Sequence, residues 1–292
     1  MHQPVLIKEL IEFLAPRQGG VYVDGCLGAG GYAEAILEAS GPDGKLFGFD
    51  IDEEALSRAQ ARLQNYGERF TCRHAGYHDA QSILKSIGVG KVDGIVVDLG
   101  LSSDQLDDPL RGFSFRFAGP LDMRFDRAAG DSAEDLLKNI SRAELEKIIR
   151  EYGEEPRAAR IAQRLKESAN GGVLTNTQEL SNVVLRTIGR KRGKIHPATR
   201  VFQALRILVN NELGNLEKGL EELPEILNQH GRLVIVSYHS LEDRMVKRSF
   251  REKSRKSERW QILTPKPLRP SREELRDNPR SRSAKMRIIE AL

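Results

Sequence analysis

Short apolar runs punctuate the chain, and several of them end in an acidic residue. They are rich in Val, Ile, Leu or Phe and too short for ordinary helices, which favours strands. We predict five strands from these runs, at residues 20–24, 45–49, 70–73, 92–98 and 231–237. The run at 92–98 is apolar almost throughout, as the central strands of parallel sheets are.

Between these runs the apolar positions follow the period of an amphipathic helix. We predict helices at residues 5–14, 32–37 and 53–63. Ser240 is placed to cap a further helix after the fifth strand. Residues 260–263 and 284–289 are expected to close the sheet as an antiparallel pair. Strands alternating with helices predict an α/β fold with a largely parallel sheet.

The pattern changes to helices alone over residues 107–210. Ser141 and Glu144 have the spacing of a capping box. We therefore predict a helical domain at residues 107–210, inserted into an α/β domain formed by residues 1–106 and 211–292.

Two more helix starts are expected inside or next to the insertion. Thr175 with Gln178 has capping-box spacing. Pro197 suits the first turn of a helix, and apolar positions from Val201 to Leu223 predict that this helix is long.

A glycine-rich turn at residues 25–31 follows the first predicted strand and precedes a helix. The next strand ends in Asp50, so the order is strand, turn, helix, strand, acid, as in nucleotide-binding units. Glycines let a ligand approach the backbone where a Cβ would collide. Asp50 is placed to accept hydrogen bonds from both hydroxyls of a ribose.

The turn has two candidate ligands, a dinucleotide and S-adenosylmethionine. A dinucleotide site needs Gly-x-Gly-x-x-Gly, but after Gly28 and Gly30 the third glycine comes two positions early, at Gly31. Asp24 at the end of the preceding strand would repel a pyrophosphate, whereas it suits the ammonium group of S-adenosylmethionine. The methyl donor is therefore favoured, and a tight turn without any ligand is the remaining alternative.

Acids end three of the buried runs of the predicted sheet: Asp24, Asp50 and Asp98. Ligands of doubly wound sheets bind at the carboxyl ends of the strands, where these three acids would gather. Tyr77 follows the third strand and could line an adenine, although a lone tyrosine in a loop commonly serves packing.

Composition narrows the class of protein. No apolar run among the 292 residues approaches the length of a membrane helix, and the first residues do not resemble a signal peptide. Two cysteines, Cys26 and Cys72, provide neither a disulfide framework nor a metal cluster, so we expect a cytoplasmic protein. His196 and His239 lack the close spacing of metal ligands, and no metal is expected.

Positive charge is concentrated near the carboxyl end. Residues 244–292 hold 16 Lys or Arg against 6 Asp or Glu, whereas residues 1–243 hold 30 against 36. This imbalance indicates a phosphate-bearing partner, and a solvated charged surface is the alternative.

Several longer strings match one known family in order along the whole chain. They are His2-Gln3-Pro4-Val5-Leu6, Asp24-Gly25-x-Leu27-Gly28-x-Gly30-Gly31, Asp98-Leu99-Gly100-x-Ser102-Ser103-x-Gln105, Arg111-Gly112-Phe113-Ser114-Phe115, Pro120-Leu121-Asp122-Met123-Arg124, Pro197-Ala198-Thr199-Arg200, His239-Ser240-Leu241-Glu242-Asp243-Arg244 and Asn278-Pro279-Arg280-Ser281-Arg282. With these strings the chain resembles the bacterial ribosomal RNA small subunit methyltransferase H family, also called MraW.

The resemblance implies transfer of a methyl group from S-adenosylmethionine to cytosine N4 of 16S ribosomal RNA at the decoding centre. It also implies a class I, Rossmann-like methyltransferase fold with a seven-stranded sheet and a helical insertion. The donor-site positions of the family fall on these residues: Gly30, Gly31, Tyr32, Asp50, Tyr77, Asp98 and Gln105. Tyr32 stands where the family usually has His, Tyr77 where it has Phe, and Cys26 where it has Thr.

Cytosine can be methylated at C5 or at N4, and the C5 route needs a cysteine that adds to the ring. Cys26 belongs to the glycine turn and Cys72 to the third strand, so N4 is favoured. Asp98 is our candidate for the group that accepts a hydrogen bond from N4, with donor binding as its alternative role.

The RNA has to be held near this site with its target base unstacked. Basic side chains at residues 186–206 and 244–287, including Arg280 and Arg282, are expected to contact its backbone. Phe113 and Phe115 are candidates for stacking on bases or for packing in the core.

Two other classes of function stay open at this point. A nicotinamide-dependent oxidoreductase could use a similar sheet, but the charge of Asp24 and the spacing of the glycines argue against a dinucleotide site. A noncatalytic RNA-binding protein could keep the fold without the reaction, against the evidence of Gly30, Asp50 and Asp98.

Overall fold

The computed structural model describes residues 4–189 and 196–292, which form two compact units. Unit 1 comprises Met1–Gly100 and Leu213–Leu292, and unit 2 comprises Leu101–Glu212. The basic run at residues 190–194 and the first two residues of the amino-terminal motif, His2 and Gln3, lie outside the described residues.

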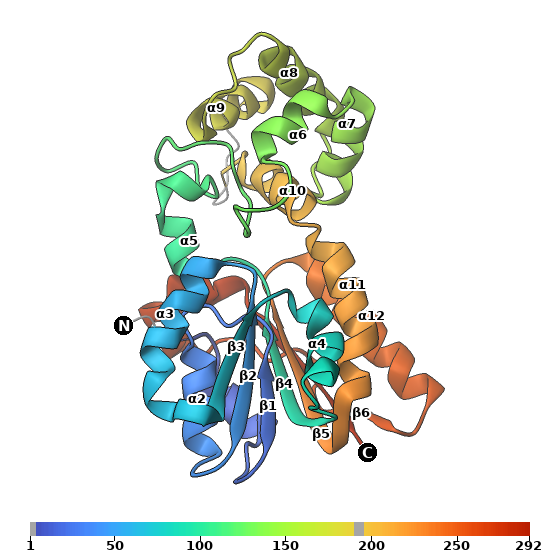
Figure 1. Cartoon of the computed structure of the whole chain (residues 1–292). Coiled ribbons are helices and arrows are strands. Elements are labelled where there is room, and N and C mark those ends of the chain that lie inside the picture. Colours follow the sequence, from blue (N-terminus) through green and yellow to red (C-terminus); the bar gives the residue numbers. More distant parts are fainter. Residues whose placement is uncertain (1–3, 190–195) are drawn as a thin grey trace. The chain divides into compact units, whose positions relative to one another are not determined.

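A seven-stranded sheet forms the centre of unit 1 (Figure 1). Its strands are β1 (Val21–Asp24), β2 (Lys45–Asp50), β3 (Phe70–His74), β4 (Val92–Asp98), β5 (Leu227–Ser237), β6 (Trp260–Ile262) and β7 (Lys285–Ala291). Their order is β3-β2-β1-β4-β5-β7-β6. The first five are parallel to one another, and β7 runs antiparallel to both β5 and β6. The five predicted strands and the closing antiparallel pair are confirmed.

Helices cover both faces of this sheet because its central strands, β4 and β5, bury side chains on both sides. The helices of unit 1 are α1 (Ile7–Leu14), α2 (Gly31–Ala39), α3 (Glu53–Leu63), α4 (Ala80–Ser86), α11 (Glu212–Glu222), α12 (Ser240–Lys256) and α13 (Arg272–Asp277), with 3-10 turns η1 (Gln64–Arg69), η2 (Tyr77–Asp79), η4 (Leu223–Ile226) and η5 (Pro279–Ser283). Leu10, Ile36 and Leu63 of α1–α3 belong to one core cluster. Leu84 and Phe250, from α4 and α12, belong to another.

In the part of unit 2 that the structure describes, helices are joined by loops and no strand is present. Its helices are α5 (Ser103–Asp107), α6 (Ala133–Asn139), α7 (Arg142–Glu151), α8 (Ala158–Asn170), α9 (Thr177–Ile188) and α10 (Thr199–Val209), with the 3-10 turn η3 (Pro109–Arg111). The predicted capping box of Ser141 and Glu144 opens α7. Within the described residues, no helix is both long and apolar enough to cross a membrane.

Three predicted helix starts or lengths are wrong. Asn176, not Thr175, caps α9, since its side chain accepts the Glu179 amide. His239, not Ser240, caps α12 in a capping box with Glu242. In both cases the residue next to the predicted cap accepts the backbone hydrogen bond at the helix start. The sequence pattern locates such a cap only to within one position.

The long helix expected after Pro197 is two helices, because the chain leaves the helical conformation between α10 and α11. Asn211 has φ +47°, in the left-handed region that asparagine tolerates. The Asn210 side chain donates from Nδ2 to the Met123 carbonyl (2.8 Å) and accepts the Phe125 amide at Oδ1 (2.7 Å). Apolar periodicity continues through the break, so the sequence pattern alone does not reveal it.

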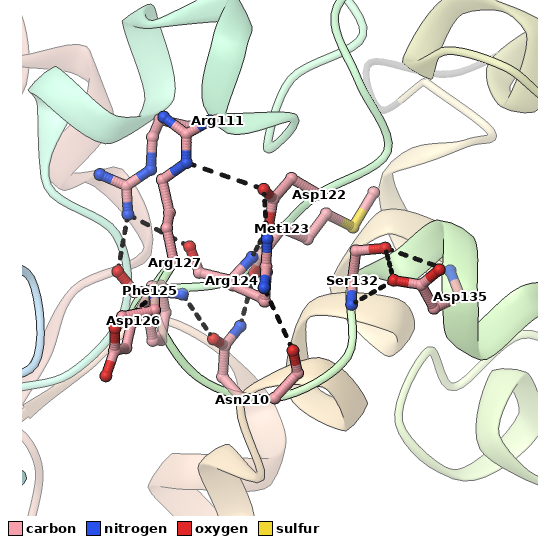
Figure 2. Close-up of polar contacts among 12 residues, drawn as sticks. Arg111, Asp122, Met123, Arg124, Phe125, Asp126, Arg127, Ser132, Asp135 and Asn210 are labelled. Carbon is pink, nitrogen blue, oxygen red and sulfur yellow. Dashed lines mark hydrogen bonds and ion pairs between the residues drawn. The ribbon is translucent and has the colours of Figure 1, made fainter.

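Asn210 belongs to a polar network that holds the loop after η3 (Figure 2). Arg111 is only 2% exposed, and its Nη2 donates to the carbonyls of Arg124 (3.1 Å) and Phe125 (2.8 Å). The Asp122 carboxylate accepts from Nε (2.8 Å) and Nη2 (3.1 Å) of Arg124. This loop is therefore fixed by its own charged side chains.

Candidate active site

The glycine turn between β1 and α2 is tied to both neighbouring strands. The Gly25 amide donates to the Val96 carbonyl (2.8 Å), and the Leu27 amide donates to the Phe49 carbonyl (2.9 Å). The Gly28 amide donates to Oδ2 of Asp50 (2.8 Å). The turn is thus fixed at the carboxyl ends of β1, β2 and β4, and these three amides are occupied within the protein.

Gly30 and Gly31 lie where α2 begins, and each position requires glycine. Gly30 has φ +79°, and a Cβ at Gly31 would lie 2.4 Å from Cγ of Pro4. The next residue, Tyr32, is buried, and its hydroxyl donates to the Val5 carbonyl. The hydroxyl of Tyr32 is thus occupied by a hydrogen bond within the protein. The expected contacts of Gly30, Gly31 and Tyr32 with S-adenosylmethionine stay predictions.

Asp24 ends β1 and is completely buried. Its Oδ1 accepts the Cys26 amide (3.3 Å), while its Oδ2 has no hydrogen-bond partner among residues 4–189 and 196–292. Burial raises the pKa of Asp24 to about 8, and the charges of Asp98 and Asp50 raise it further. The backbone amides of Cys26 and Ala33 oppose this rise. A buried carboxylate oxygen without a partner is costly, so this atom marks a place for a cationic or hydrogen-bonding ligand.

Asp50 ends β2 and receives backbone amides at both carboxylate oxygens. Oδ2 accepts from Gly28 (2.8 Å) and Oδ1 from Asp52 (2.9 Å). Burial raises the pKa of Asp50, and these two amides counteract it. Each oxygen keeps a further lone pair for the ribose hydroxyls that we expect it to bind.

Asp98 ends β4, and Oδ1 of its carboxylate accepts the Tyr238 hydroxyl (3.0 Å). Burial raises the pKa of Asp98 to about 7, against the effect of that hydrogen bond and with the Glu242 charge adding to the rise. Tyr238 follows β5 directly, and the sequence analysis missed it. Its place as an aromatic residue at the carboxyl end of a central strand could have identified Tyr238 as a site residue.

The sheet register brings these acids together. Asp24 pairs with Gly48 of β2 on one side and with Val96 of β4 on the other. Asp50 and Asp98 each lie two residues further along those strands. The order of the strands reverses between β1 and β4, which is where doubly wound sheets bind their ligands.

Tyr77 lies beside the glycine turn in a space that two other glycines leave open. A Cβ at Gly25 would lie 2.7 Å from Cβ of Tyr77, and a Cβ at Gly219 would lie 2.7 Å from its Cε2. The tyrosine therefore packs between the turn and α11. This position is compatible with lining an adenine, which stays a prediction.

Gln105 belongs to unit 2, on the short helix α5. Its side-chain oxygen accepts the Ser102 amide (3.0 Å), and its own amide donates to Oγ of Ser102 (3.1 Å). Gln105 completes a capping box, and its expected contact with the donor stays a prediction.

The two histidines considered as metal ligands both serve at helix starts. Nδ1 of His196 accepts the Ala198 amide (3.2 Å), and Nδ1 of His239 accepts the Glu242 amide (3.3 Å). His196 also lies against the ring of Phe115, with centroids 4.5 Å apart.

Phe113 and Phe115 pack within unit 2. Phe113 is buried against Phe125, with centroids 5.5 Å apart, and Phe115 meets Phe202 at 5.0 Å. Of the two roles considered for these rings, the structure supports packing rather than base stacking. Phe117 in the same loop is 63% exposed and is the ring that faces solvent there.

Comparison with known proteins gives the family of this chain. The model of the MraW methylase family matches residues 1–292. The chain belongs to this family. It is 46% identical to the ribosomal RNA small subunit methyltransferase H of Thermomicrobium roseum, over 100% of this chain and 94% of that protein. It is 47% identical to the protein of the same name from Trichlorobacter lovleyi, over 100% of this chain and 98% of that protein.

Among solved structures, the chain is similar to an rRNA methylase from Streptococcus thermophilus. The identity is 12% and the TM-score 0.44, over 100% of this chain and 99% of that one.

MraW methylases use S-adenosylmethionine as methyl donor, and the residues at the strand ends fit this molecule. The donor carries an ammonium and a sulfonium, and three carboxylates gather at this edge of the sheet. The unpartnered Oδ2 of Asp24 suits the ammonium group, whereas a pyrophosphate would be repelled there. Asp50, preoriented by two amides, suits the ribose.

Proposed function

We propose that this protein transfers a methyl group from S-adenosylmethionine to the exocyclic N4 of a cytidine in 16S ribosomal RNA of the small ribosomal subunit. One observation carries the proposal: three carboxylates gather at the strand ends, and one of them has a buried oxygen without a partner, in a chain of a methylase family. The names of the relatives support small-subunit ribosomal RNA as the substrate.

Asp24 and Asp50 hold the donor in this proposal, the former at the ammonium and the latter at the ribose. S-adenosylmethionine supplies an electrophilic methyl group on its sulfonium. The alternative hypothesis of a dinucleotide ligand requires backbone amides of the glycine turn that are free to bind a pyrophosphate. Here Gly25, Leu27 and Gly28 donate to acceptors within the protein, which argues against it.

The cysteines favour N4 over C5 as the atom that is methylated. Burial raises the pKa of the Cys26 thiol well above its usual value, and Asp50 and Asp24 add to the rise. A thiol with a raised pKa stays protonated and is a poor nucleophile. Cys72 lies on β3 and accepts a hydrogen bond from Nε2 of Gln60 (3.3 Å).

Asp98 is the proposed acceptor for the amine of the cytosine. Tyr238 occupies Oδ1, so Oδ2 can take a hydrogen bond from N4 and localise its lone pair. A carboxylate with a pKa of about 7 is also suited to receive the proton that N4 loses on methylation. The alternative role of Asp98 is to bind the donor, and the two roles differ in their kinetics.

We propose that unit 2 recognises the RNA. We expect the whole protein to act in the cytoplasm. In unit 2, Arg142 and Arg160 are exposed on its helices and are available to the RNA backbone. The target cytidine must be unstacked to reach Asp98, which is easiest for a base that is already unpaired.

The direct test is incubation with methyl-labelled S-adenosylmethionine and small subunits that lack the modification, with free 16S RNA and DNA in parallel. After digestion, we expect the label in N4-methylcytidine from the subunits. Label in 5-methylcytidine would overturn the assignment of the acceptor atom. Absence of label from every sample, with donor binding intact, would refute the methyltransferase activity on these substrates.

A further inference from the structure

One face of α12 carries a row of arginines. Arg244, Arg248, Arg251 and Arg255 are all exposed, and their spacing of four, three and four residues places them on one side of the helix. Lys247 lies next to this row on the same side. We call these five residues the α12 stripe.

The α12 helix is held firmly, so the stripe is a fixed surface. Val246 and Phe250 on its other side are 1% exposed and belong to the core. Asp243 binds Lys285 (3.0 Å) and Nε of Arg287 (2.7 Å), which fastens the start of α12 to β7.

Several cations of the stripe have no acidic partner. Lys247, Arg248 and Arg251 form no ion pair or side-chain hydrogen bond with any other residue that the structure describes. Other cations of the same helix are neutralised, since Lys253 pairs with Glu225 and Lys256 with Glu252. Within the stripe, Lys247, Arg248 and Arg251 are therefore the cations available to an external anion.

A small pocket adjoins the stripe. Lys247 and Arg251 contribute its cations, whereas the guanidinium of Arg287, which also lines the pocket, is held by Asp243. Phe250, Ile262 and Pro265 contribute apolar surface. Cations around an apolar floor suit a phosphodiester with its attached sugar better than they suit an isolated inorganic ion.

The stripe begins at the edge of the sheet that carries the candidate active site. Asp98 pairs with Val236 of β5, and α12 starts at Ser240, four residues further on. The eleven helical steps from Arg244 to Arg255 span about 16.5 Å at 1.5 Å per residue. The row thus leads away from Asp98 over the length of a few nucleotides.

We propose that the α12 stripe and its pocket bind backbone phosphates of the RNA strand that flanks the methylated cytidine. This inference rests on the proposed function, and it assigns a substrate-binding surface to unit 1 in addition to the one expected on unit 2. Two unpartnered cations at i and i+4, Lys247 and Arg251, are the residues that the pocket shares with the stripe.

The test uses the full chain with Lys247→Gln/Arg251→Gln and a control of equal charge, Lys45→Gln/Lys91→Gln. Both control residues are exposed, Lys45 at the amino end of β2 and Lys91 directly before β4, so they lie at the edge of the sheet opposite the candidate site. Binding to undermodified small subunits and to naked 16S RNA is measured over a series of salt concentrations, alongside donor binding. The stripe variant should bind both about tenfold more weakly, and the slope of log K against log salt should fall by about 1.4, at roughly 0.7 per phosphate contact.

Donor affinity should be unchanged in both variants, and the control should bind RNA as the unaltered protein does. Equal RNA affinity and salt slope in the stripe variant and the control would overturn the inference. A loss of binding to subunits but not to naked RNA would also overturn it, because the stripe would then contact a ribosomal protein. If the unaltered protein binds RNA through the stripe but transfers no methyl group, the proposed function fails while this surface stands.

Discussion

The strand ends of unit 1 and the arginine-rich loop of unit 2 both concentrate charge, but in opposite ways. In the loop, Asp122 is met by Arg124, whose Nε and Nη2 both donate to it, with Arg127 at 3.7 Å. At the strand ends, Asp24 forms no ion pair with any residue that the structure describes, and its Oδ2 has no hydrogen-bond partner among them.

The pKa values express this difference. Burial would raise the pKa of Asp122, but the hydrogen bonds of Arg124 and the charges of Arg124 and Arg127 bring it below its usual value. Burial raises the pKa of Asp24 to about 8, and neighbouring acids add to the rise. Charge that the chain itself neutralises stabilises the fold, whereas charge left without a counterion marks a site for an external cation. Four predictions test this contrast.

The largest effect is expected for Asp24→Asn, which keeps the shape of the side chain and removes its charge. Donor affinity should fall by about 100-fold or more, since breaking a buried ion pair costs about 3–5 kcal/mol. Calorimetry with S-adenosylmethionine measures this loss. Asp43→Asn, at an exposed position of a turn, is the control and should bind as before. An unchanged affinity of Asp24→Asn for S-adenosylmethionine would show that Asp24 does not bind the ammonium group of the donor.

Asp98→Asn should lower kcat about 100-fold at saturating donor, in the range of a lost general base. Donor affinity should change by less than about threefold, since Asp98 serves the acceptor in this proposal. Tyr238→Phe keeps the carboxylate but removes its hydrogen bond, and should lower kcat only about threefold. A large loss of donor affinity with normal kcat in Asp98→Asn would assign this acid to the donor instead.

Asp122→Asn should lower stability by about 1–2 kcal/mol, because it removes a partly buried ion pair. The folded pKa of Asp122 lies below its unfolded value, so its stabilisation is present above the unfolded pKa and is lost as pH falls through the folded one. Denaturant unfolding at pH 7 and pH 3 should show a smaller difference from the unaltered protein at pH 3. Donor affinity should be unchanged in Asp122→Asn. A changed donor affinity would contradict the separation of a stabilising ion pair in the unit 2 loop from a ligand site at the strand ends of unit 1.

The smallest effect is expected from pH alone. Asp24 and Asp98 have pKa values raised to about 8 and about 7, so both gain negative charge as pH rises through neutrality. Because Asp24 is the acid proposed to bind the donor ammonium, donor affinity should increase about tenfold between pH 6 and pH 7.5. The ligand-free protein should behave oppositely, because raised folded pKa values make these two acids destabilising as pH rises from about 4 to about 8. A donor affinity that is flat over this range would contradict the raised pKa values.

The sequence by itself determined the strands and the motif at the first of them. Each of the runs that end in Asp24, Asp50 and Asp98 is a strand in the structure, because continuous apolar runs of that length suit only a sheet covered on both faces. The parallel arrangement then places those acids at one edge, which follows from topology without any side-chain detail. Chain order and residue type were enough for this part of the candidate site.

The tertiary structure decided which charges are satisfied and where helices stop. Asn210 binds the Met123 carbonyl 87 residues away, and Asn211 turns the chain at a point where the apolar periodicity runs on. Tyr238 meets Asp98 only because β5 lies beside β4, 140 residues later in the chain. Such contacts depend on distances between segments far apart in sequence, and a local pattern of apolar and polar residues carries no information about them.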